Sequence, residues 1–256
     1  MTINSKFLLL SLLSVSFNVF SMGSSMPKQS PVPNHRWPKS GAPTLYLQRG
    51  LAPLRSCDNV ITLSKKLKGS VVTNVKGFCV WDLKGGILDG KNQKGDQSQN
   101  ENQEQLLSDR TPLNIKNGFV TNNKDAMNFT APKSGVIKMT WLNVGEDAVS
   151  TSRGAQNFTI EDCEFINKKS GDKSIQMNEA EGLRMFNNLI YSGITCARIG
   201  DSGINKPSDT AYVGGNKFVS CDTAYNISSI TVRSEKKDSY ENVRLEKKFD
   251  NGGSFK

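Results

Sequence analysis

The sequence has almost no histidine, and this shortage excludes several kinds of catalytic site. Among its 256 residues there is one histidine, His35, in a proline-rich stretch near the N-terminus. A catalytic triad built on histidine and a zinc site with histidine ligands are therefore not expected. No two of the five cysteines have the C-x-x-C spacing either, so the chain offers no cysteine-based metal motif.

Long hydrophobic runs are missing after the first twenty residues, which argues against an integral membrane protein. The one such run, "FLLLSLLSVSFNVF" after Lys6, is short for a transmembrane span and is typical of an export signal. Val19 and Ser21 suit a signal peptidase, so we expect a signal peptide over 1–21 and a secreted, soluble, monomeric mature protein. Residues 22–50 are rich in Pro, Ser and Gly and predict a linker, and residues 51–256 predict one domain.

The number of cysteines is odd, and an oxidising compartment would permit disulfides among them. Cys57 with Cys79 is the pair that we expect to form a bridge. For Cys163, Cys196 and Cys221, packing as small buried residues is at least as good an interpretation.

The middle of the chain repeats a pattern of apolar residues at strand-like alternation. The pattern is apolar, any, apolar, four residues, apolar, and its copies start 24, 21, 25 and 28 residues apart. Its members are Leu113/Ile115/Val120, Ile137/Met139/Val144, Phe158/Ile160/Phe165, Leu183/Met185/Ile190 and Ala211/Val213/Phe218. This spacing is too short for a βαβ unit, and Asn, Gly and Asp between the copies supply turns. We predict an all-β, single-domain, right-handed parallel β-helix, with Met139, Ile160, Met185 and Val213 in one inward file.

An antiparallel β-sandwich would also give many short strands with turns between them. The spacing of the copies favours the β-helix.

The predicted coils bring acidic and basic residues to one part of the surface. Counted from the last apolar residue of their copies, Lys173 and Arg198 are both eight residues on, so we expect them to stack on neighbouring coils. The stretches "DAMNF" and "DAVST" read as the same strand in neighbouring coils, which groups Asp125 with Glu146 and Asp147. Three carboxylates so close would repel one another without a cation between them, and oxygen ligands of this kind suit Ca²⁺. A solvated acidic turn balanced by Lys and Arg is the alternative.

These residues carry a resemblance to a known family. The stretches "NKDAMNF", "WLNVGEDAVST", "SGDKSIQMN" and "CARIG" resemble the ordered signatures of the family 3 polysaccharide lyases, from about Asp82 to about Phe218. Members of that family are secreted pectate lyases with a single-domain parallel β-helix. The resemblance implies Ca²⁺ bound by Asp125, Glu146 and Asp147, a catalytic base at Lys173, and an arginine beside it at Arg198. It also implies an acidic residue ahead of the first coil, which Glu101 would supply.

Two features depart from the family. The family commonly has a second lysine three residues before the arginine, where this chain has Thr195, and "GIHC" where this chain has "AMNF". The first departure bears on the rate or on a substrate subsite, and the second prevents the family's disulfides from being carried over.

The formal net charge of +9 suits a polyanionic ligand. The favoured function is a secreted, Ca²⁺-dependent pectate lyase that cleaves polygalacturonate by β-elimination. A β-helix that binds acidic polysaccharide without cleaving it is the alternative, and a β-helical hydrolase with paired aspartates ranks below both. No RNP-like, helix-turn-helix or aromatic-stacking motif indicates a nucleic-acid partner.

Overall fold

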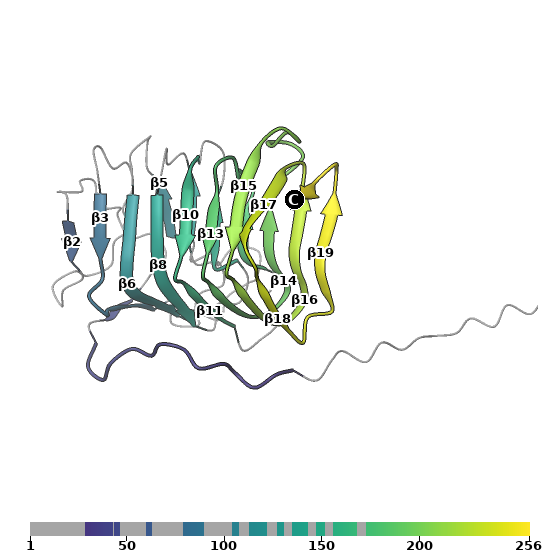
Figure 1. Ribbon diagram of the computed structural model, residues 1–256. Helices are drawn as coiled ribbons and strands as arrows, with labels where there is room; N and C mark the ends of the chain where they lie inside the picture. The colour runs from purple at the N-terminus through teal and green to yellow at the C-terminus, as the bar shows by residue number, and fades with distance from the viewer. Residues whose placement is uncertain are drawn as a thin grey trace, which may run out of the picture.

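The chain forms a right-handed parallel β-helix, as the repeat predicts (Figure 1). The computed structural model describes residues 29–42, 44–46, 60–62, 79–89, 104–107, 113–121, 127–130, 135–142, 147–151, 156–167 and 173–256. Within these ranges there is no helix long and apolar enough to cross a membrane. Every strand pairs in parallel with its equivalents one coil away, which gives three sheets that the longest strands join at the corners.

Sheet I is the first of the three faces in each coil. It consists of β2 (Val60–Thr62), β3 (Cys79–Asp82), the first part of β6 (Leu113–Thr121), the first part of β8 (Gly135–Leu142), β10 (Phe158–Glu161), β13 (Arg184–Phe186), β15 (Thr210–Gly214), β17 (Thr231–Lys236) and β20 (Ser254–Phe255).

Sheet II follows sheet I around the coil. It consists of β1 (Thr44–Tyr46), β4 (Ile87–Asp89), the later parts of β6 and β8, β11 (Glu164–Ile166), the first part of β14 (Leu189–Ile199), the first part of β16 (Lys217–Ser228) and β18 (Ser239–Glu241).

Sheet III closes each coil. It consists of β5 (Glu104–Leu107), β7 (Met127–Thr130), β9 (Val149–Thr151), β12 (Lys173–Met177), the later parts of β14 and β16, and β19 (Leu245–Asp250).

The core is built from apolar files that run along the axis of the β-helix. One file from sheet I contains Ile115, Ile137, Ile160, Met185 and Val213, all fully buried and in register. The prediction that Met139 belongs to this file is wrong, because Ile137 is the register partner of Ile160. Met139 is nevertheless fully buried. A shift of two residues keeps every side chain on the same face of a strand, so alternation alone does not distinguish the two registers.

A second file, from sheet II, contains three of the largest fully buried side chains of the core, Trp141, Phe165 and Phe218. Trp141 is in register with Phe165, and their rings stack with centroids 4.6 Å apart. Phe218 continues the file and stacks on Tyr240 of the last coil at 5.6 Å. Stacking like side chains on successive coils therefore fills the interior continuously.

Buried side chains satisfy the backbone at the corner between sheets I and II. Asp162, Asn187 and Gly215 take left-handed backbone conformations there, with φ of 53°, 55° and 68°. The residue after each turn donates its buried N–H to a side chain of the next coil: Cys163 to Asn188 Oδ1 at 3.0 Å, Asn188 to Asn216 Oδ1 at 3.1 Å, and Asn216 to Asp238 Oδ1 at 2.8 Å. We call the three accepting side chains, Asn188, Asn216 and Asp238, the corner ladder. It pairs polar groups that the core would otherwise leave without partners.

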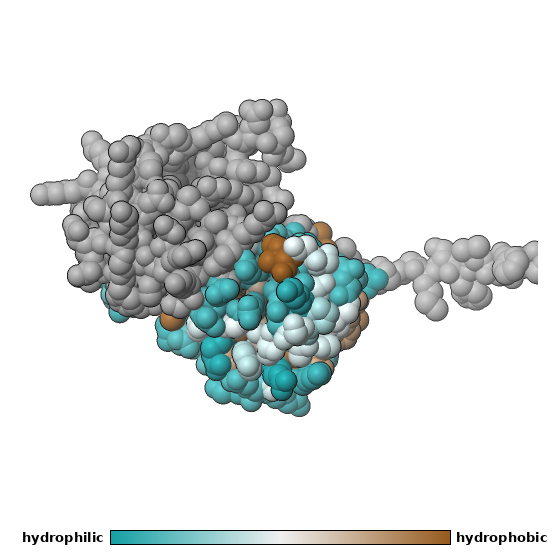
Figure 2. All heavy atoms as spheres, turned by 90° about the horizontal axis from the view of Figure 1, so that it is seen from above, coloured by the Kyte–Doolittle hydropathy of each residue, from teal (hydrophilic) through white to brown (hydrophobic). Residues whose placement is uncertain are grey.

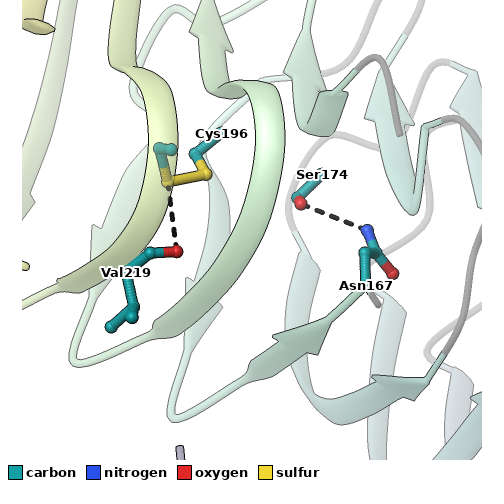
Figure 3. The surroundings of a disulfide bond; sticks show 5 residues. Asn167, Ser174, Cys196 and Val219 are labelled. Carbon is teal, nitrogen blue, oxygen red and sulfur yellow. Dashed lines mark hydrogen bonds between the residues drawn. A yellow bond between two sulfur atoms is a disulfide. The ribbon is translucent and has the colours of Figure 1, made fainter. Parts of the chain in front are cut away.

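One disulfide joins two successive coils (Figure 3). Cys196 of β14 and Cys221 of β16 are bonded, with their Cα atoms 5.9 Å apart. The interpretation of these two cysteines as small buried residues therefore misses their bond, whereas Cys163 is a buried free thiol as that interpretation holds. The expected partner of Cys79, Cys57, lies outside the described residues.

Residues 29–42, within the stretch expected to be a linker, lie along the β-helix below sheet II (Figure 1). We call this segment the N-terminal strap. Near its start the Tyr191 hydroxyl donates to the Ser30 carbonyl at 2.9 Å, and further on Arg36 Nε lies 3.0 Å from Glu164 Oε2. The chain then reaches β1, which pairs with β4. The strap thus runs from late coils back to early ones, against an apolar cluster of Phe119, Leu142, Ile166, Tyr191 and Val219.

The last coil places a lysine where earlier coils have core residues. Lys247 of β19 is in register with Tyr225, whose ring is fully buried. The Lys247 ammonium lies 4.4 Å from the centroid of the Phe255 ring and 5.8 Å from that of Tyr240. A cation therefore covers the aromatic end of the core.

The face of the molecule seen from above is mainly polar in its described part. Figure 2 shows mainly hydrophilic residues on this face, with small separate hydrophobic areas. This part of the surface offers no broad apolar patch to a partner.

Candidate functional site

The polar face of sheet III carries the residues that the sequence singles out. On this face one row contains Lys173, Thr195, Thr223 and Leu245, in register on successive strands. A second row, three residues further along each strand, contains Ser150, Gln176, Arg198, Asn226 and Lys248. On β12, β14 and β16 the residues between the two rows are buried, whereas the members of the rows are partly exposed.

Asp147 and Lys173 form the ion pair at the start of the first row. The Lys173 Nζ lies 3.6 Å from Asp147 Oδ1, and their side chains are only 14% and 15% exposed. A backbone hydrogen bond holds the two residues close together, because Ala148 N–H donates to the Ser174 carbonyl of the next coil at 3.2 Å. The Ser174 hydroxyl in turn accepts from Asn167 Nδ2 at 3.3 Å (Figure 3). Water is largely excluded from the pair, so a charged group of a ligand would interact strongly with it.

Arg198 does not stack on Lys173, and the prediction that it does is wrong. Lys173 is in register with Thr195, whereas Arg198 is in register with Gln176 and lies three residues further along the strand, a rise of about 10 Å. Lys173 follows Phe165 and Arg198 follows Ile190 by the same number of residues, but the chain does not take the same course in the two coils. From Ile190 to Arg198 the chain is one continuous strand, β14, whereas β11 ends before Lys173 begins β12.

Arg198 is held by an acidic residue that the sequence analysis did not select. Its Nη2 lies 3.5 Å from Asp201 Oδ2, three residues later, and both side chains are about a third exposed. The signal in the sequence was the short "RIGD" stretch, in which the chain turns immediately after the strand. Asp201 can orient the guanidinium without burying it, which leaves donors free to meet an anion.

Of the three expected calcium ligands, the structure describes Asp147 alone. Asp125, Glu146 and the further predicted residue Glu101 lie outside the described residues. Residues Met127 and Val149 are in register, so "MNF" and "VST" are the same strand in neighbouring coils, as predicted. Asp125 and Asp147 are the same number of residues apart in the sequence as Met127 and Val149 are.

The donor set suits calcium in chemical type, since carboxylate oxygens are the ligands that this cation takes. Within the ranges that the structure describes, no three His, Cys, Asp or Glu side chains come together to hold a metal.

Thr195 is the register partner of Lys173 on the next coil. It is partly exposed, and Ile194 next to it is half exposed. The row therefore has one described cation, at Lys173, followed by neutral side chains at Thr195, Thr223 and Leu245.

A second polar site lies beside the strap, a segment whose composition predicts only a linker. A pocket of about 710 Å³ lies between the strap and the early coils, and Trp37, Lys39, Asp82 and Lys84 help to line it. The sequence signal was a tryptophan between basic residues, "HRWPK", in a stretch too rich in proline to be read as packed structure.

Comparison with known proteins gives no further guide to the site. No protein-family model matches the chain, and neither a curated protein nor a solved structure does so.

Proposed function

We propose that this protein is a Ca²⁺-dependent pectate lyase that cleaves polygalacturonate by β-elimination. The β-helix is compatible with proteins that act on polysaccharides. The observation that carries the proposal is the ion pair between Asp147 and Lys173, which joins an acidic and a basic residue of neighbouring coils in a mostly buried position. The reaction requires two groups: a carboxylate that binds the cation and an amine that accepts the proton.

In the proposed reaction, Lys173 takes the C5 proton of a uronate through its Nζ. The electron pair of that C–H bond forms the C4=C5 double bond, the bond from C4 to the glycosidic oxygen breaks, and a proton from water completes the leaving hydroxyl. When bound by Asp125, Glu146 and Asp147, Ca²⁺ would supply Lewis-acid stabilisation of the charge on the uronate carboxylate. Arg198, oriented by Asp201, donates charge-assisted hydrogen bonds to the same developing anion.

Lys173 must be a neutral amine to accept a proton, because an ammonium has no lone pair. A rate that rises with pH is the expected sign of such a base, and a pH–rate profile of the lyase reaction measures it.

A second candidate function, binding of acidic polysaccharide without cleavage, is favoured by Thr195. A lysine at this position would place a second cation in register with Lys173, and the threonine does not. Binding alone needs cations on the surface, whereas cleavage needs a base and a stabilised anion together.

The deciding experiment measures the ultraviolet absorbance of unsaturated uronate ends released from polygalacturonate, with Ca²⁺ and with a chelator. We expect product only with Ca²⁺, and a fall in kcat of about 10² to 10⁴ in Lys173→Gln, with little change in KM. Lys173→Arg should not restore the rate, because a guanidinium stays protonated. Asp147→Asn should lose calcium affinity, measured by calorimetry, together with activity.

Lys248→Ala is the matched control. Lys248 lies on the same face of sheet III, is half exposed and pairs with Asp250, so its loss should leave the rate unchanged. A wild-type rate of zero at every pH and Ca²⁺ concentration, combined with retained binding to polygalacturonate, would replace the lyase with the binding protein. Near-normal kcat in Lys173→Gln would place the base elsewhere.

A further inference from the structure

The pocket between the N-terminal strap and the early coils has the dimensions of a ligand site. Its volume of about 710 Å³ falls within the range of about 300–1,000 Å³ that is usual for such sites. It is lined by the strap on one side and by the corner that contains Asp82, Lys84 and Asn117 on the other. Asp82 and Asn117 belong to β3 and β6, and Lys84 to the turn between β3 and β4, so the pocket is separate from the Asp147–Lys173 pair at sheet III.

An aromatic ring is presented at this pocket. Trp37 is 59% exposed, although its proline-flanked segment is held in place by Arg36. The Arg36 guanidinium donates to the Asp162 carbonyl at 2.7 Å and pairs with Glu164 at 3.0 Å. The ring of His35 lies beside the indole, with centroids 4.3 Å apart. A fixed, exposed indole is a surface on which the apolar face of a flat ring can pack.

The charges around the tryptophan are mainly positive. Arg36 is compensated by Glu164, but no described acidic residue pairs with Lys39 or Lys84. Asp82, the one acid among the described lining residues, accepts from Lys84 N–H at 3.0 Å and from Asn117 Nδ2 at 3.2 Å, and its Oδ2 lies 3.8 Å from Lys116 Nζ. A negatively charged ligand would therefore meet two available ammonium groups and one carboxylate with remaining acceptor capacity.

We infer that this pocket binds an acidic oligosaccharide. The indole of Trp37 packs on a sugar ring, Lys39 and Lys84 bind the sugar carboxylates, and Asp82 accepts hydrogen bonds from sugar hydroxyls. A phosphodiester backbone would satisfy the lysines, but it brings no donors to Asp82 and would be repelled by it. The mixture of donors, acceptors and one aromatic ring thus favours a polyhydroxylated anion over a nucleic acid.

Titration calorimetry of the full-length chain with trigalacturonate, in the presence of a chelator, tests this site without the proposed calcium site. We expect binding that weakens at least tenfold in Trp37→Ala and in the Lys39→Ala/Lys84→Ala double variant. Trp37→Tyr should keep most of the affinity, because a tyrosine ring can still pack on the sugar. Lys248→Ala, which removes an exposed cation from sheet III, should bind as the wild type does.

Three results would overturn the inference. They are no binding by the wild type at millimolar ligand, unchanged affinity in both pocket variants, and tighter binding of a thymidylate oligonucleotide of equal charge. Lys173→Gln separates this inference from the proposed function: it should lose lyase activity and keep chelator-resistant binding. Loss of that binding in Lys173→Gln, with retention in Trp37→Ala, would assign the sugar to sheet III and not to the pocket.

Discussion

Replacing Asn216 by leucine should destabilise the protein strongly, because this residue is the central member of the corner ladder. Its Oδ1 accepts from the Asn188 backbone N–H at 3.1 Å and from Asn188 Nδ2 at 3.0 Å. Its Nδ2 donates to the Met185 carbonyl at 3.0 Å. Leucine has a similar volume but no polar atom, so the N–H of Asn188 and the carbonyl of Met185 would remain buried without these partners.

The size of the effect follows from those orphaned groups. Each buried polar group left unpaired costs about 1–3 kcal/mol, so two give about 2–6 kcal/mol. A whole domain is stable by only about 5–15 kcal/mol, so Asn216→Leu should remove a large fraction of the free energy of unfolding. Urea unfolding followed by circular dichroism measures this as a lower midpoint at an unchanged slope.

The neighbouring residue supplies the control. Lys217 pairs with Glu241 at 3.2 Å, and both side chains are about half exposed, so Lys217→Ala should change the free energy of unfolding by less than about 1 kcal/mol. If Asn216→Leu lies within 1 kcal/mol of the wild type, the ladder is not what satisfies this corner, and the reasoning is wrong.

Three further predictions concern the cysteines. Cys196 and Cys221 close a loop of 25 residues, so the Cys196→Ser/Cys221→Ser variant should lose about 3 kcal/mol in urea unfolding, and equal midpoints for the variant and the oxidised wild type would contradict this. Burial raises the pKa of the Cys163 thiol to about 12, so Cys163 should not react with a thiol reagent at pH 8 in the folded protein, whereas it should in the unfolded protein; mass spectrometry of the labelled peptides measures this at Cys163 alone. The same raised pKa means that the unfolded state releases this proton first, between about pH 9 and 12, and the folded state loses stability over that window by up to about 1.4 kcal/mol per pH unit. Cys163→Ala should flatten this part of the pH dependence, and an identical pH dependence in the variant would count against it.

The fold could be predicted because its determinants are periodic. Apolar residues at strand spacing recur in every coil, and files such as Ile160, Met185 and Val213 follow directly from that repetition. The register predicted for Met139 is wrong because a shift of two residues leaves the pattern of buried and exposed positions unchanged.

The candidate site was harder to predict, because it depends on the segments between strands. The pairing of Asp147 with Lys173 and the alignment of Thr195 with Lys173 depend on how many residues each turn contains, which the apolar pattern does not report. The bond between Cys196 and Cys221 depends on the same registers.

The strap was missed for another reason. Proline and serine lower the tendency to form regular structure, but they do not prevent a segment from lying in an extended form against a surface. Arg36 and Ser30 hold the strap this way, each through more than one hydrogen bond to distant coils, and such contacts have no local pattern in a sequence.

The lysine at the end of the core has a consequence for how copies of this chain meet. A β-helix ends in strands whose outer edge lacks a further coil, and such an edge can template the addition of strands from another molecule. For a second molecule to dock here, the ammonium of Lys247 would have to be buried away from water between this aromatic end and the docking molecule. Growth of filaments by stacking on this end is therefore opposed by one side chain, and Lys247→Leu should make the purified protein assemble with time, as light scattering would detect.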